Sequence, residues 1–432
     1  MNPHQAPTLL THVCREWRMV ARSIPDLWSS MIIELRFKKT VSAGPVFLDA
    51  LQDWLALSRN RLLTIEYHST IRDHTDISTS ILNLICSHAH RWKDVFFDVD
   101  GHETAPALSL DSFPSLTQFQ YRGNPAIQVE SWLTPLRRSP NLCTLMLEWW
   151  PAYNEWSLPW PQLTSFHVDD IVEDANAAFD LNRFAANLSQ STQLKSLQLD
   201  FTEHVAIVPA RERGFAPEVV DIDINVFAQP MLAEIIQALA APKLESLTLG
   251  SEHYDPHETG DVTRALFSFL SDSGWPSALR ILLVQLYGSP EVEVVEILER
   301  LPNLIELRVD GLPLTPVFLA PLTFRISDDG QLLSGTNPHV SSLLLYRYEQ
   351  AQPQLEDIVA LADMVESRWH VPPNAVDGNG RAVQRLDEFG MLKYDVEYVE
   401  KNFSEQYGRI ERCRLEGLRW TIDPIDSISI TP

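Results

Sequence analysis

The residues best suited to bind a metal ion lie in the short stretch EHYDPHE, residues 252–258. His253, Asp255 and His257 alternate along it, with Glu258 next to them, so an extended backbone would aim the three alternating side chains to one side. Imidazole and carboxylate groups arranged in this way are ligands for a divalent cation. The stretch follows a predicted strand and precedes a predicted helix, however, where polar loops are common. We therefore favour a solvated loop and expect neither a metal nor another cofactor.

Catalytic motifs are missing from the sequence. It contains no Walker loop, GxGxxG, GxSxG or HExxH pattern. The carboxylate pairs Asp169-Asp170 and Asp328-Asp329 are adjacent in sequence, so they define no acid–base geometry. We predict that the protein is not an enzyme.

Four tryptophans gather in one connection: Trp149, Trp150, Trp156 and Trp160. Tryptophan is favoured in binding hot spots, so an exposed cluster would suit a protein partner. Packing in the core beneath a long loop is the interpretation that we favour.

The composition narrows the class of protein. The chain has 432 residues, of which 45% are hydrophobic, and its formal net charge is −24. Such an acidic balance argues against binding to nucleic acid or to an anionic membrane. The four cysteines form no CxxC pair, and the sequence shows neither a basic and apolar leader nor an apolar run of transmembrane length. These features predict a cytoplasmic or nuclear protein.

A repeated frame runs through the chain, Pro-x-Leu-x-x-[Leu/Phe]-x-[aliphatic/Tyr]. Five copies begin with proline: PSLTQFQY (114–121), PNLCTLML (140–147), PQLTSFHV (161–168), PKLESLTL (242–249) and PNLIELRV (302–309). The frame without the proline recurs at Trp92-Val95-Phe97, Leu194-Leu197-Leu199, Leu279-Leu282-Val284 and Val340-Leu343-Leu345, with weaker copies at Leu386-Phe389-Met391 and Leu415-Leu418-Trp420. The last two apolar positions are two residues apart, which places both on one face of a strand.

Segments between the frames suit helices. They include 229–240, 261–272 and 291–301, the last with a predicted apolar stripe of Val292, Val295, Ile297 and Leu301. A strand, a turn and a helix that repeat at intervals of 21 to 50 residues predict an irregular leucine-rich-repeat solenoid of the α/β class over 31–432, which begins with a strand at 31–37. The longest intervals indicate insertions or a missed copy, and we expect an insertion at 203–225.

In such a solenoid, the residue inside each L-x-L pair faces outward on the concave strand surface. These residues are Gln120, Met146, His167, Gln198, Thr248, Leu283 and Arg308. Their mixed polar and apolar character suits a protein partner better than a phosphate or a metal. We expect that charge reversal at Arg308 or His167 weakens capture of the partner without unfolding the protein.

The opening stretch THVCREWRMVARSIPDLW (11–28) is amphipathic. Leu10, Val13, Trp17, Val20 and Ile24 share one face of a predicted helix, which Pro25 ends. Leu27 and Trp28 then supply a second apolar anchor.

This stretch resembles the second half of the F-box, whose pattern is Val-Cys-[Lys/Arg]-x-Trp-[Arg/Lys]-x-x-Ala followed by Leu-Trp. The matching residues are Val13, Cys14, Arg15, Trp17, Arg18, Ala21, Leu27 and Trp28. Segments 90–99, 361–369 and 415–422 are also similar to F-box and leucine-rich-repeat proteins of basidiomycete fungi. The resemblance implies a partial F-box over 1–30 ahead of the repeat domain.

The resemblance also implies a function. F-box proteins are non-catalytic substrate receptors of Skp–cullin–F-box ubiquitin ligases, in which the F-box binds the Skp adaptor of the cullin–RING ligase and the repeats hold a target protein, here unknown. The Leu-Pro-x-Glu-[Ile/Leu]-Leu helix that opens the family's F-box is absent from this sequence. The alternative is therefore a leucine-rich-repeat scaffold for protein interactions with no role in a ligase.

Overall fold

A computed structural model of the chain describes residues 7–35, 44–69, 76–99, 110–123, 130–151, 158–172, 178–201, 206–253, 261–347 and 353–423. The chain forms two compact units. Unit 1 consists of Met1–Phe179 and Gln190–Gln198, and unit 2 consists of Asp180–Ser189 and Leu199–Pro432. The predicted boundary after residue 30 stays a prediction.

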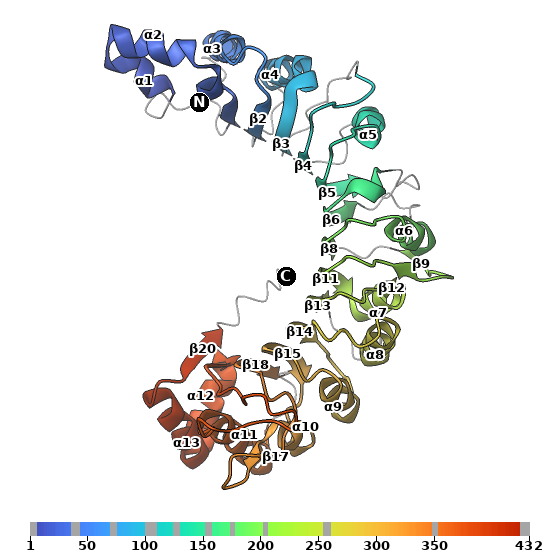
Figure 1. Cartoon of the computed structure of the whole chain (residues 1–432), viewed down its shortest axis with the longest axis vertical. Helices are drawn as coiled ribbons and strands as arrows, with labels where there is room; N and C mark the ends of the chain where they lie inside the picture. The colour runs from blue at the N-terminus through green and yellow to red at the C-terminus, as the bar shows by residue number, and fades with distance from the viewer. Residues whose placement is uncertain are drawn as a thin grey trace. The chain divides into compact units, whose positions relative to one another are not determined.

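Unit 1 is built on parallel strands that pair in chain order. They are β1 (Ser30–Leu35), β2 (Leu63–Ser69), β3 (Trp92–Val99), β4 (Gln118–Gly123), β5 (Thr144–Pro151) and β6 (Ser165–Val172). The helical elements are α1 (Thr8–Val13), α2 (Arg15–Ser23), η1 (Pro25–Trp28), α3 (Gly44–Leu57), α4 (Asp76–Ser87), η3 (Ala89–Arg91), α5 (Glu130–Arg137) and η4 (Trp160–Gln162). Helices α3, α4 and α5 lie along one side of the sheet (Figure 1).

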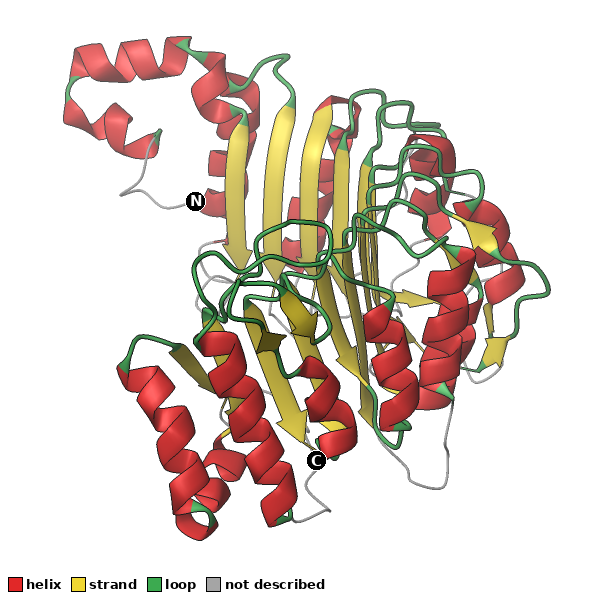
Figure 2. Cartoon of the chain, turned by 60° about the horizontal axis from the view of Figure 1, so that its bottom comes forward, coloured by secondary structure: helices red, strands yellow, loops and turns green. Residues whose placement is uncertain are grey.

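Unit 2 repeats this arrangement. Its parallel strands, again paired in chain order, are β11 (Asp221–Ala228), β13 (Ser246–His253), β14 (Ile281–Gln285), β15 (Glu306–Leu312), β18 (Ser342–Arg347), β19 (Glu388–Leu392) and β20 (Arg419–Asp423). Its helices are α6 (Leu181–Leu188), α7 (Gln229–Gln237), α8 (Val262–Asp272), α9 (Glu291–Glu299), α10 (Pro316–Leu322), α11 (Leu355–Trp369), α12 (Lys393–Asn402) and α13 (Ser404–Leu415). Figure 2 shows these helices in red beside the yellow strands.

Several short strands complete the set. They are β9 (Ile207–Val208), β10 (Gly214–Phe215), β12 (Leu239–Ala240), β16 (Arg325–Ile326) and β17 (Leu332–Ser334), together with β7 (Phe179–Asp180) and β8 (Ser196–Phe201), which cross the division between the units. The structure is therefore α/β with extensive parallel sheet.

All of the predicted frames become strands. In every copy but the last, both apolar residues spaced by two are buried in the core, as Phe119 and Tyr121 are in β4 and Leu247 and Leu249 are in β13, whereas Trp420 of the last copy is half-buried. The first apolar residue of the frame, such as Leu116 or Leu244, is also buried. It packs the turn ahead of each strand against the sheet. The exception is the last copy, in which Leu415 ends α13 and is exposed.

Two of the longer parallel strands, β2 and β11, were not predicted from the sequence, and neither were the short strands β7, β9, β10, β12, β16 and β17. Strand β2 starts without a proline. Strand β11 contains Ile222 and Ile224, which together with Val219 just before the strand have the spacing of the frame and are buried. Strand β11 begins inside the range predicted as an insertion, 203–225, and pairs with β13. This part of the expected insertion is therefore a regular strand, and the long interval there contains a missed copy.

The three helices predicted between the frames are present, with one correction to a buried face. In α9 the buried residues are Val294, Ile297 and Leu298, and Val292 of the predicted stripe is exposed. With Leu301, which follows the helix, the buried set has the spacing i, i+3, i+4 and i+7 of one helical face, and this pattern fits the helix better than the predicted stripe.

Candidate functional site

The N-terminal segment does not form the single helix that the apolar spacing predicts. Cys14 is extended, with φ −156° and ψ 175°, and separates α1 from α2. Its Sγ accepts a hydrogen bond from the backbone N of Trp17 at 3.5 Å, which caps α2. Arg18 Nε donates to the carbonyl of Thr11 at 2.7 Å and holds the two helices together.

The apolar face of this segment is exposed within the part of the chain that the structure describes. Val13 is 59% exposed, Trp17 53% and Val20 57%, and Leu9, Met19 and Ile24 are exposed as well. Large apolar side chains gathered on one short segment mark a surface for an interaction partner. Arg15, Arg18 and Arg22 make the same segment basic.

Trp28 and Ala21 attach the segment to the rest of unit 1. Trp28 of η1 is 5% exposed, its Nε1 donates to the carbonyl of Ala21 at 2.8 Å, and its ring meets Trp54 of α3 edge-on at 5.1 Å. Leu27 is half-buried. The residues that match the F-box pattern therefore divide into an anchor, Ala21 with Trp28, and an exposed group, Val13, Cys14, Trp17 and Arg18.

The predicted outward-facing residues lie on the face of the sheet opposite the helices. Gln120, Met146 and His167 are register partners on β4, β5 and β6. Thr248, Leu283 and Arg308 are register partners on β13, β14 and β15 of unit 2. All of these residues, and Gln198 on β8, are half-buried, so the residues of each row are near one another and accessible together.

Burial shifts the pKa of two residues on this face. Burial lowers the pKa of His167, and the charge of Arg122 lowers it further, which favours the neutral imidazole. Burial raises the pKa of Asp223 on β11, as does the neighbouring Asp221, whereas a hydrogen bond from Asn225 opposes the rise. The face thus mixes neutral, polar and acidic groups.

A charged cluster on unit 1 was missed by the sequence analysis. His68 of β2 contacts Glu66 Oε1 through Nε2 at 2.7 Å and Asp98 Oδ2 of β3 through Nδ1 at 2.9 Å. The alternating Glu66 and His68 are a weak local signal, but the contact with Asp98 depends on strand pairing across 30 residues. The cluster is suited to polar recognition.

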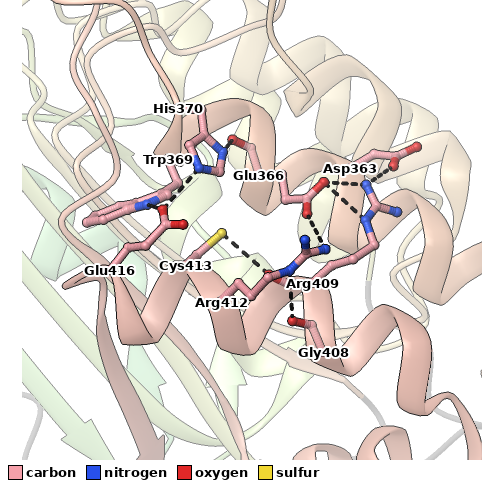
Figure 3. A network of polar contacts seen from close by, with 9 residues as sticks. All are labelled: Asp363, Glu366, Trp369, His370, Gly408, Arg409, Arg412, Cys413 and Glu416. Atoms are coloured by element: carbon pink, nitrogen blue, oxygen red, sulfur yellow. Dashed lines mark hydrogen bonds and ion pairs between the residues drawn. The ribbon is translucent and has the colours of Figure 1, made fainter.

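A network of hydrogen bonds and ion pairs on unit 2 connects α13 to α11 (Figure 3). Arg409 donates to Glu366 and Asp363, and Glu416 accepts hydrogen bonds from Trp369 Nε1 at 2.9 Å and from His370 Nε2 at 3.1 Å. Burial, with nearby carboxylates, raises the pKa of Cys413 to about 11, so its thiol stays protonated and is a poor nucleophile at neutral pH. The network therefore stabilises the packing of α13 on α11.

The candidate ligands at 253–258, for which we expect a solvated loop, and the tryptophan cluster lie only partly within the described residues. His253 stacks on Phe227 at 5.2 Å, and Asp255, His257 and Glu258 lie outside the described residues. No group of three or more potential metal ligands occurs among the residues that the structure describes. Trp160 is buried against Phe166 at 4.7 Å, which confirms core packing for this one tryptophan of the four.

Within the described ranges, none of the helices has the length and apolar character needed to cross a bilayer. No family model matches the chain, and no curated protein matches it.

Proposed function

We propose that this protein is a non-catalytic substrate-recognition subunit of a Skp–cullin–F-box ubiquitin ligase. In this proposal the segment α1–η1 binds the Skp adaptor, and the sheet face opposite the helices holds the target protein. The observation that carries the proposal is the exposure of Val13, Trp17 and Val20 on a segment whose residues match the second half of the F-box.

The repeat domain is proposed to be a leucine-rich-repeat solenoid. Strands that pair in parallel in chain order, most of them led by a buried apolar residue, support this architecture within each unit. A row of half-buried, mixed side chains suits a protein target, and the charge of −24 disfavours a nucleic acid or an anionic membrane. The proposal implies a cytoplasmic or nuclear location, where these ligases act.

Co-purification of the full chain with a purified Skp adaptor tests the proposal. Trp17→Ala should weaken the complex about tenfold, because it removes a large exposed apolar contact. Val46→Ala is the matched control, since Val46 is an exposed apolar residue of α3 outside the segment. If the wild-type chain retains no adaptor, the ligase function is lost and the scaffold alternative takes its place.

A further inference from the structure

A groove of about 650 Å³ lies on unit 2 between α11 and the first residue of α10. Pro316 forms part of its lining, together with Leu355, Val359 and Ala360 of α11, and the carboxylates of Glu356 and Asp363 border it. We call it the α11 groove. It lies on the helical side of the unit, away from the face proposed to hold the target.

The α10 side of the groove is unusually apolar. The helix reads PVFLAPL and has no polar side chain. Phe318, Leu319 and Leu322 are buried, but Val317, directly after Pro316, is 51% exposed. Across the groove Leu355 is 55% exposed. A helix that is apolar on every side is normally covered on every side, so this surface is suited to an apolar partner.

The acidic residues around the groove favour a basic partner. Its charged lining residues, Glu356 and Asp363, are both acidic, and Asp363 accepts a hydrogen bond from Arg409. Helix α9, which precedes α10, carries four glutamates and no basic residue. An apolar groove with an acidic border fits an amphipathic helix that carries arginine or lysine.

The chain itself carries such a helix. Helix α2 exposes Trp17, Met19 and Val20 together with the arginines at 15 and 22. It has nine residues, and the part of α11 that lines the groove, Leu355–Asp363, also spans nine, about 13 Å at roughly 1.5 Å per residue. We propose that the α11 groove of one copy binds α2 of a second copy.

The contact is heterologous, because α2 of one copy binds the α11 groove of another. Each copy has both surfaces. Copies that carry a net charge of −24 repel one another, so the binding should be weak, with a dissociation constant of about 1–100 µM. A copy whose α2 is bound in this way cannot present the same apolar face to another partner. Self-association does not depend on the proposed ligase function, and the two are tested separately.

A fluorescent peptide of residues 8–28, titrated with the full chain, tests the proposal by anisotropy. We expect saturable binding that Leu355→Lys weakens about tenfold, since a charged group would enter the apolar groove. Leu333→Lys is the matched control, because Leu333 is 70% exposed on β17 of the same unit and should leave the affinity within about twofold.

Two further measurements complete the test. A peptide with Arg15→Glu and Arg22→Glu should bind at least about tenfold more weakly, because both charges then repel the acidic border. Sedimentation of the full chain should show association that rises with concentration and that Leu355→Lys abolishes. A peptide that does not bind, or equal effects of Leu355→Lys and Leu333→Lys, would overturn the proposal.

Discussion

The guanidinium of Arg308 hydrogen bonds to both carboxylate oxygens of Asp310, two residues further along β15. Its Cζ also lies 4.6 Å from the ring centroid of Tyr346 on β18. The side chain of Asp310 is only 3% exposed, so Arg308 supplies a counter-charge to a buried carboxylate. Arg308 therefore contributes to stability in addition to lying on the outward face of the strand.

The first prediction concerns this pair. Arg308→Glu should lower the free energy of unfolding by about 2–4 kcal/mol, because it replaces attraction to a buried carboxylate by repulsion. Urea unfolding measures the change. Arg325→Glu, at an exposed position of β16, should change it by less than about 0.5 kcal/mol. Equal effects would show that the contact with Asp310 is unimportant, and charge reversal at Arg308 would then be usable as a binding probe.

The second prediction separates anchoring from docking in the N-terminal segment. Trp28→Ala should destabilise unit 1 by about 3–5 kcal/mol, because the ring is buried against Trp54 and its Nε1 donates to Ala21. Trp17→Ala should cost less than about 0.5 kcal/mol, since the ring is mostly exposed. Chemical denaturation followed by far-ultraviolet circular dichroism gives both values, and a large loss from Trp17→Ala would contradict the assignment of its ring to a docking surface.

The third prediction concerns the pH dependence of the His68 cluster. Burial lowers the pKa of His68, but hydrogen bonds and charges from Asp98 and Glu66 outweigh it, and the net pKa lies above 6.5. A raised pKa in the folded state means that protonated His68 stabilises the protein. This stabilisation is complete below pH 6.5 and is lost as the pH rises through the pKa of the folded state.

Replacement of His68 by Gln should therefore cost more stability at about pH 5.5 than at about pH 8.5. His167→Gln supplies the contrast. Because the folded-state pKa of His167 is lowered, folding loses stability as the pH falls through 6.5, and the variant should be relatively more stable at low pH. Urea titrations at both pH values compare the two variants, and slopes of the same sign would refute the assignment.

The fourth prediction concerns the polar contacts that hold α13 on α11. Arg409→Gln should raise hydrogen exchange across Ser404–Leu415 and lower the stability of unit 2 by about 1–2 kcal/mol, because it breaks contacts with Glu366 and Asp363. Arg412→Gln is the control. Arg412 Nη2 lies 3.8 Å from Glu366 and its side chain is 68% exposed, so its loss should cost less than about 0.5 kcal/mol.

The sequence alone determined where most strands lie. A frame such as Leu244-Leu247-Leu249 gives a buried turn residue followed by two residues on one strand face, and this pattern is local. The same logic placed His167 and Thr248 on the opposite face. It missed β11, although Val219, Ile222 and Ile224 follow Pro217 with the spacing of the frame. There valine replaces the leading leucine, and acidic residues stand between the apolar positions.

The tertiary structure alone decided which side chains meet. Pairing of β2 with β3 brings His68 to Asp98, and the two are 30 residues apart in the chain. The exposed face of α2 and the groove beside α11 also depend on what neighbouring elements leave uncovered. An apolar stripe specifies a face that favours burial, but only the arrangement of the other elements determines whether the chain buries that face itself or leaves it exposed to a partner.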